Sequence, residues 1–369
     1  MMFNSLEEKF ISQAHELLHP AVHLPGQSGW ECPSNIALIK YWGKKPFQLP
    51  LNPSVSMTLK HSKTVISVDY FYQRKLKEMS FSYFFEDKQH PTFEDRYRQY
   101  LEHVSKYLPF LNHIELVIKS RNTFPHSAGI ASSASSFGAL ALALCDIERS
   151  LFGTLAEDYD FMEKASFLAR LGSGSACRSV YGGFSLWGRT EDLMVSTDEA
   201  AISLNFIIHP VFTDYCDSIL IIDSGKKEVS SSSGHRMMEH HPFASARIAR
   251  VHDNLKRMLI SLQTGKEQKF STLVEEEALT LHAMMLTSQP GYILLKPNSL
   301  EVIDRIRQFR ITTGMPVGFT LDAGANVHLL FPARLISEIK PFIEGQLSGF
   351  CQEGKVIHDT IGTGPVKIL

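Results

Sequence analysis

The chain has 369 residues, of which 44% are hydrophobic and 21% are charged, and its formal net charge at pH 7 is −2. This length accommodates two lobes around one cleft, and the composition is typical of a globular protein in water. The balanced charge provides no basic field for nucleic acid, so we expect no nucleic-acid partner. Any anionic substrate must be held by a few individually placed lysine and arginine side chains.

The cysteines and the hydrophobic runs indicate the cellular location of the protein. The five cysteines are scattered and never form a Cys-x-x-Cys pair, which is typical of reduced thiols in the cytoplasm. No apolar run approaches the ~18 residues of a membrane span, so we expect no membrane partner. Glu7, Glu8 and Lys9 stand where a signal peptide would have its apolar core. The sequence therefore predicts a cytoplasmic protein.

The first half of the chain alternates between helix and strand patterns. Leu6, Phe10, Ala14 and Leu17 recur at helical spacing and predict an amphipathic surface helix in an N-terminal extension at 1–28. β-Branched and aromatic runs predict strands at 36–42, 55–59, 65–70, 114–118 and 184–187. Helical spacing of apolar residues predicts helices at 94–107, in a segment that ends near 152, and at 157–171.

The second half of the chain has longer helical patterns. Helices are predicted at 242–263, 267–286 and 299–312, and strands at 218–223, 316–321 and 326–331, the last two as a hairpin. A boundary between 195 and 215 gives an N-terminal lobe at 29–205 and a C-terminal lobe at 206–369. The predicted fold class is α+β, with two lobes whose motifs converge on a cleft.

Residues 125–136 form a small-residue turn that leads from the strand at 114–118 into a helix. Backbone N–H groups at a helix start lack partners, and the helix dipole favours an anion beside them, so the turn is a candidate phosphate site. The hydroxyls of Ser132 and Ser133 could contact a phosphate oxygen or a bound Mg²⁺. A serine-rich helix cap is an equally good interpretation of either residue.

The strand predicted at 36–42 ends within the segment Lys40-Tyr-Trp-Gly-Lys44. Two ammonium groups and a phenol beside a turn can hold a polyanion through charge-assisted hydrogen bonds. Solvated lysines on an edge strand are the competing interpretation, and this segment alone favours it.

Arg178 is surrounded by four glycines and three serines in the segment 172–183. Small neighbours let a ligand approach the guanidinium closely, and arginine binds carboxylates through two parallel hydrogen bonds. An arginine that binds a turn carbonyl is the less favoured alternative.

Asp322 lies between the apolar strand at 316–321 and an Ala-Gly turn. Its side chain either stabilises the turn through an Asx hydrogen bond or extends as a carboxylate into the cleft. The segment by itself favours the turn, and the other motifs favour the cleft.

Three further features are interpreted as structural. His235, His240 and His241 lack the i, i+4 spacing of a helical metal site, so we expect them at the surface. The aromatic residues of 70–100 are interpreted as core and strand face, and the run Glu275–Glu277 as a solvated helix face.

Four segments recur together in one known family. They are Asn35-Ile-Ala-Leu-Ile-Lys-Tyr-Trp-Gly-Lys44, residues 122–133, Gly172-Ser-Gly-Ser-Ala-Cys-Arg-Ser179 with Tyr181-Gly-Gly183, and Asp322-Ala-Gly324. With this combination the chain resembles the diphosphomevalonate decarboxylase family of the GHMP kinase superfamily, over about residues 30 to 365. The resemblance implies a ribosomal-S5-domain-2-like N-terminal lobe and an α/β-sandwich C-terminal lobe, with the active site between them.

The resemblance also implies an activity: ATP- and Mg²⁺-dependent decarboxylation of mevalonate 5-diphosphate to isopentenyl diphosphate. Asp322 would face the 3-hydroxyl as base or orienting charge, Arg178 would hold the C1 carboxylate, and Lys40 would support the site. The implied substrate-binding residues are Tyr41, Lys44, Ser173, Ser175 and Arg178. The implied ATP-binding residues are Ser127, Ala128, Gly129, Ile130, Ala131, Ser132, Ser133 and Ser231, with Ser133 also a contact for Mg²⁺. A homodimer is the oligomeric state that the family suggests.

Two alternatives remain open at this point. A relative on the same scaffold could use mevalonate or its 5-monophosphate and stop after 3-phosphorylation, although Tyr41 and Lys44 match a diphosphate holder. A non-catalytic nucleotide-binding regulator predicts loss of the acid–base residue, whereas Asp322 is present. The chain departs from the family at Ser232 and Ala325, where some relatives carry arginine and proline respectively.

Overall fold

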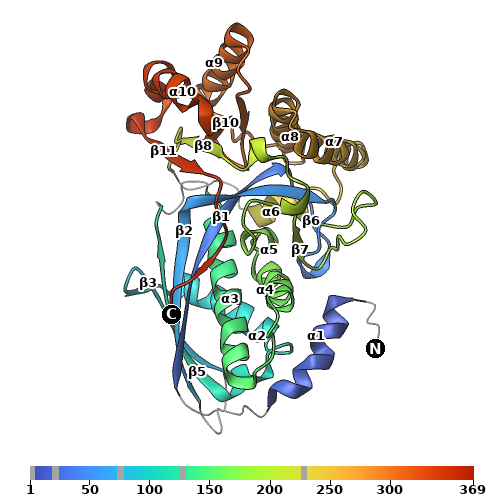
Figure 1. Ribbon diagram of the computed structural model, residues 1–369, viewed down its shortest axis with the longest axis vertical. Helices are drawn as coiled ribbons and strands as arrows, with labels where there is room; N and C mark the ends of the chain where they lie inside the picture. The colour runs from blue at the N-terminus through green and yellow to red at the C-terminus, as the bar shows by residue number, and fades with distance from the viewer. Residues whose placement is uncertain (1–4, 19–24, 73–78, 125–129, 226–230) are drawn as a thin grey trace.

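Two sheets organise the computed structural model, which describes residues 5–18, 25–72, 79–124, 130–225 and 231–369. The larger sheet is formed mainly by the first part of the chain and the smaller one by the second, each with its own helices (Figure 1). This arrangement agrees with the predicted two-lobed α+β fold.

The larger sheet has eight strands in the order β12-β1-β2-β5-β3-β4, with β6 paired to β2 and β7 paired to β6. Its strands are β1 (Gly26–Ile39), β2 (Ser54–Tyr72), β3 (Ser80–Phe85), β4 (Lys88–Gln89), β5 (Ile114–Asn122), β6 (Phe184–Trp187), β7 (Ala201–Ser203) and β12 (Val366–Lys367). The strands predicted at 55–59 and 65–70 form one continuous strand, β2. The N–H groups of the intervening Lys60 and His61 both donate to Asp359, and these bonds hold the backbone extended.

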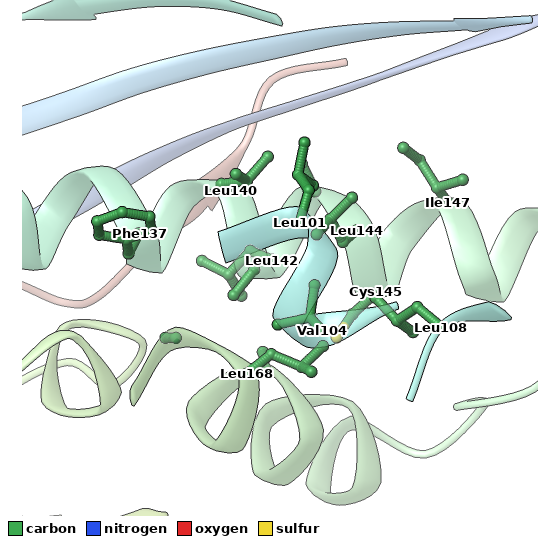
Figure 2. Packing of buried hydrophobic residues seen from close by; sticks show 14 of the residues in the cluster. Leu101, Val104, Leu108, Phe137, Leu140, Leu142, Leu144, Cys145, Ile147 and Leu168 are labelled. Atoms are coloured by element: carbon green, nitrogen blue, oxygen red, sulfur yellow. The ribbon is translucent and has the colours of Figure 1, made fainter. Parts of the chain in front are cut away.

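Four helices pack beside this sheet: α2 (Pro91–Val104), α3 (Ser132–Phe152), α4 (Asp158–Gly172) and α5 (Ala176–Ser179) (Figure 1). Helix α3 lies directly on β1 and β2 and is buried on nearly all sides, which suits its almost uninterrupted apolar sequence. Figure 2 shows the resulting core, in which α3 contributes Phe137, Leu140, Leu142, Leu144, Cys145 and Ile147.

The amphipathic helix predicted near the N-terminus is present as α1 (Leu6–Ala14). Phe10 is buried, and its ring lies 5.0 Å from that of Phe167 on α4. Lys9 of α1 forms an ion pair with Glu163, which also lies on α4, at 2.7 Å. Helix α1 therefore packs on the N-terminal lobe.

The smaller sheet has the strand order β11-β8-β10-β9. Its strands are β8 (Tyr215–Leu220), β9 (Gly318–Thr320), β10 (Val327–Pro332) and β11 (Val356–Thr360). The accompanying helices are α6 (Ser231–Arg236), α7 (Ala244–Thr264), α8 (Glu267–Leu286), α9 (Pro297–Thr313) and α10 (Ile336–Phe342). None of the helices that the structure describes is long and apolar enough to cross a membrane.

The C-terminal segment ties the two lobes together. Asp359 of β11 accepts hydrogen bonds from the consecutive N–H groups of residues 60–62 at 2.8 to 2.9 Å. Further along, β12 pairs with β1 in the larger sheet. One core cluster also joins Ile36 of β1 to Phe270 of α8, so the end of β1 is fixed against the second lobe.

Candidate active site

A cavity of about 180 Å³ lies where the end of β1 meets α5 and the loop between β9 and β10. Its walls come from both lobes and comprise Ala37, Lys40, Tyr41, Trp42, Lys44, Gln48, Arg96, Ala131, Ser133, Gly172, Ser173, Gly174, Ser175, Arg178, His235, Leu281, Asp322 and Ala323. The structure thus brings the Lys40–Lys44 segment, the segment around Arg178 and Asp322 to one place.

Lys40 and Asp322 form an ion pair between the lobes. Lys40 Nζ lies 2.8 Å from Asp322 Oδ1 and also donates to the carbonyl oxygen of Ala37 at 2.6 Å. The Lys40 side chain is 1% exposed, which excludes the solvated lysine of the competing interpretation. Burial lowers the pKa of Lys40, and the Asp322 carboxylate opposes that shift. The pair orients the Asp322 carboxylate at the cavity wall.

Glu277 of α8 holds the backbone at Lys40. Its Oε2 accepts the Lys40 N–H at 3.0 Å, while Arg247 donates to both carboxylate oxygens and Asn254 to one of them. Glu277 is 0% exposed and Glu275 is 3% exposed, so the predicted solvated face is wrong for both. Arginines from neighbouring helices neutralise these carboxylates in the interior, and helical spacing alone could not indicate that pairing.

Arg178 is 2% exposed, and burial lowers the pKa of its guanidinium. One Nη donates to the hydroxyl of Ser54, whereas Nε has no hydrogen-bond partner among the described residues. A buried guanidinium with an unsatisfied N–H at a cavity wall fits an anionic ligand. Gly174 keeps the wall open, since a Cβ there would lie 2.8 Å from the Trp187 ring and 3.0 Å from Tyr41 Oη.

Tyr41 and Lys44 line the same cavity. Tyr41 Oη is buried and unpartnered within the described part of the chain, and burial raises its pKa. Lys44 Nζ donates to Gln48 Oε1 at 3.1 Å. The pKa of Lys44 is lowered, first by burial and then by the charges of Arg236 and Arg96. This part of the cavity therefore suits a polyanion.

The serine-rich turn is described from Ile130 onward, so the predicted phosphate contacts Ser127, Ala128 and Gly129 lie outside the described residues. Ala131 is the N-cap of α3, with φ 34°, and no side chain caps the helix. Ser132 and Ser133 are therefore helical residues and not its caps. Ser133 Oγ lies 3.4 Å from Ser173 Oγ in the cavity, and Ile130 is buried in the core.

A second, smaller cavity adjoins the first at the start of α3. It is lined by Tyr83, Phe85, Phe93, Arg96, Tyr97, Ser120, Asn122, Ser132, Ser133, Ser136 and Phe137. Arg96 and Ser133 line both cavities, so a ligand in one lies beside a ligand in the other. Ser231 begins α6, and its side chain is outside the description.

Family models and curated relatives place this chain among known proteins. The model of the diphosphomevalonate decarboxylase-like N-terminal domain matches residues 32–201, and that of the mevalonate 5-diphosphate decarboxylase C-terminal domain matches 218–366. Diphosphomevalonate decarboxylase from Saccharomyces cerevisiae is 32% identical over 84% of this chain and 79% of its own length. The corresponding protein of Ganoderma lucidum is 30% identical over 86% and 81%. The chain belongs to the diphosphomevalonate decarboxylase family.

Solved structures of the family share the fold described above. Mevalonate diphosphate decarboxylase from Staphylococcus aureus superposes with a TM-score of 0.80 at 27% identity, covering 94% of this chain and 99% of that one. MDDEF in complex with MVAPP, AMPPCP and magnesium superposes with a TM-score of 0.77 at 27% identity and the same coverage. The similarity spans both lobes, which confirms the predicted family and fold.

The histidines differ from the sequence prediction. His235 is 9% exposed and lines the first cavity, and His241 is 7% exposed with Nε2 bonded to the Met284 carbonyl, so the surface prediction is wrong for both. His240 is exposed as predicted. Within the described ranges, no three His, Cys, Asp or Glu side chains group as a metal site.

Trp42, Gln48 and Arg96 also join the cavity without having been predicted. Arg96 lies on α2, far along the chain from the other motifs. A single arginine on an amphipathic helix gives no sequence signal for a ligand contact.

Proposed function

We propose that this chain catalyses the ATP-dependent decarboxylation of mevalonate 5-diphosphate in the mevalonate pathway, releasing isopentenyl diphosphate, ADP, phosphate and CO₂. The observation that carries the proposal is one cavity that holds both the Lys40–Asp322 pair and the Arg178 N–H that lacks a partner among the described residues. A 3-hydroxy acid needs a carboxylate to act on its hydroxyl and a cation to hold its carboxylate. The ligands of the related MDDEF complex, MVAPP and AMPPCP with magnesium, support the same substrate set.

The first step transfers the γ-phosphoryl group of ATP to the tertiary 3-hydroxyl. Asp322 accepts or orients the hydroxyl proton while the oxygen bonds to phosphorus and ADP leaves. Lys40 holds the Asp322 carboxylate in position from the opposite lobe. Phosphorylation replaces hydroxide, a poor leaving group, with phosphate.

The second step removes phosphate and CO₂. The C3–O bond breaks, phosphate takes the bonding electrons, and C3 acquires positive character. The C1–C2 bond then breaks, its electron pair forms the C2=C3 double bond, and CO₂ departs. Arg178, with Ser173 and Ser175 beside it, holds the C1 carboxylate and so aligns the breaking bond.

The remaining predicted residues are assigned to the phosphates. Tyr41 and Lys44 hold the 5-diphosphate, and the turn 127–133 with Ser231 surrounds the phosphates of ATP. Mg²⁺ would neutralise charge on the ATP phosphates. Ser133 is the residue assigned to hold it, since a hydroxyl oxygen suits this ion and Ser133 lines the cavity, with its Oγ 3.4 Å from Ser173 Oγ.

A substrate panel tests the proposed function. The chain is incubated with Mg-ATP and, separately, with mevalonate, its 5-phosphate or its 5-diphosphate, while ADP and CO₂ are recorded separately. We expect equal amounts of ADP and CO₂ with the diphosphate. ADP without CO₂ would identify a 3-kinase, and neither product with any substrate would refute catalysis.

The same proposal includes three further assignments, which concern the bounds of the lobes, the oligomeric state and the cellular location. We assign the lobes to 29–205 and 206–369, a homodimeric state and a cytoplasmic location. All five cysteines are free and buried, which is compatible with a reducing compartment. Light scattering after size-exclusion chromatography tests the dimer.

A further inference from the structure

His235 of α6 reaches the cavity between two aromatic side chains of the Lys40–Lys44 segment. Its ring centroid lies 4.3 Å from that of Tyr41 and 4.8 Å from that of Trp42. The residue is 9% exposed, and it lines the cavity together with Lys44 and Arg96. The imidazole thus lies among the groups that suit a polyanion.

One hydrogen bond of the ring fixes its tautomer. His235 Nδ1 accepts the backbone N–H of Gly43 at 2.9 Å, so the proton of the neutral ring is on Nε2. Burial and the charge of Lys44 lower the His235 pKa to about 3, which keeps the ring neutral near pH 7. No hydrogen bond joins Nε2–H to another described residue, so this donor is available to a ligand in the cavity that His235 lines.

We infer that His235 Nε2–H donates a hydrogen bond to a phosphate oxygen of the substrate's diphosphate group. The donor acts beside Lys44 and Tyr41, and the Gly43 bond sets its direction. The chemical identity of the ligand rests on the proposed function, but the donor itself rests on the geometry of the ring. His235 is therefore a binding residue for the anionic end of the substrate, contributed by the second lobe.

Inorganic pyrophosphate is the probe, added to the full-length chain with AMPPCP and Mg²⁺ present to occupy the nucleotide site. Wild type is compared by calorimetry with H235F, which keeps an aromatic ring, and H235N, which places an acceptor near Gly43 but no donor at Nε2. We expect both variants to bind pyrophosphate about tenfold more weakly or worse, since each loses a hydrogen bond to a charged group. H235Q, whose amide reaches the Nε2 position, should recover much of the loss.

Two readouts separate this role from a packing role. Nitrogen-15 spectra of the histidine ring should show a protonated Nε2 in the free chain and a shift of that signal on addition of pyrophosphate. In steady-state assays of H235F and H235N, KM for the diphosphate substrate should rise with little change in kcat. Wild-type pyrophosphate affinity in both variants, a proton on Nδ1, or equal loss of AMPPCP affinity would overturn the inference. Because wild-type turnover is measured separately, failure of the proposed function is distinguishable from these outcomes.

Discussion

The Asp322 carboxylate is held by an ammonium group from the other lobe, so its replacement should affect turnover more than binding. For D322N we expect kcat to fall by roughly 10²-fold or more while substrate affinity is retained, since the amide keeps the shape but cannot take a proton. Release of ADP and CO₂ measures the effect. Thermal melts must accompany the assay, because Lys40 loses its counter-charge.

D304N is the matched control, since Asp304 is an exposed aspartate on α9. Near-normal turnover of D322N would reject the assigned role of the carboxylate.

Arg178 offers a second test at the same scale. In R178K a compact ammonium replaces the planar fork that binds a carboxylate through two hydrogen bonds. We expect kcat/KM to fall by about tenfold or more, the loss of a hydrogen bond to a charged group. R189K, at an exposed arginine, should leave kinetics unchanged. Equal kinetics in both variants would exclude Arg178 from the substrate contacts.

Lys44 predicts a pH dependence. Burial and neighbouring cations lower its pKa below the ordinary lysine value of 10.5, so its positive charge is lost at a lower pH than usual as pH rises. KM for the diphosphate substrate should therefore increase on the alkaline side. In K44R the arginine keeps its positive charge at alkaline pH, so the increase of KM should begin at a higher pH. If KM of K44R increases at the same pH as that of the wild type, another group causes the increase.

At the scale of elements, α8 positions both partners of the ion pair. Glu277 binds the backbone of Lys40, and His282 Nε2 donates to the main-chain oxygen of Asp322 at 3.1 Å. Both side chains project from α8, so this helix fixes the position of the end of β1 relative to the loop between β9 and β10.

The neighbouring glutamates of α8 give a matched stability test. E277A leaves Arg247 buried without its counter-charge and should lower the free energy of unfolding by about 3–5 kcal/mol. E276A removes partly exposed ion pairs with Arg250 and Arg257 and should cost about 0–1 kcal/mol. Urea unfolding measures both. Equal losses in the two variants would contradict a special role for Glu277.

Helix α8 also indicates how far the sequence could predict the fold. Its range, Glu267–Leu286, agrees with the prediction, because apolar residues recur along its whole length. Its buried glutamates could not be predicted, since their arginine partners lie on other helices. Likewise, no range was predicted for β12, because its two residues carry no periodicity.

The candidate site was predictable where its chemistry is concentrated in short segments. The segments at Lys40–Lys44, around Arg178 and at Asp322 each combine a charged group with small residues or a turn, and the structure places them on one cavity. Arg96 and His235 lack such local context. They join the site only because α2 and α6 bring them there.

At the scale of the whole molecule, Asp359 connects the lobes through three backbone N–H groups of β2. D359A leaves these buried or half-buried donors without an acceptor and should lower the free energy of unfolding by about 1–3 kcal/mol. D304A, at an exposed position, should stay within about 0.5 kcal/mol. Unfolding midpoints followed by fluorescence measure both. A neutral D359A would mean that other contacts hold the lobes.

The pairing of β12 with β1 has a consequence for biosynthesis. Trp30 and Glu31 leave the ribosome long before Lys367 and Val366, their partners in the sheet. Until then the backbone of β1 on that side has no neighbouring strand, and open strand edges invite association between nascent chains. Chains truncated before β12 should therefore aggregate during expression, although they contain every residue of the cavity.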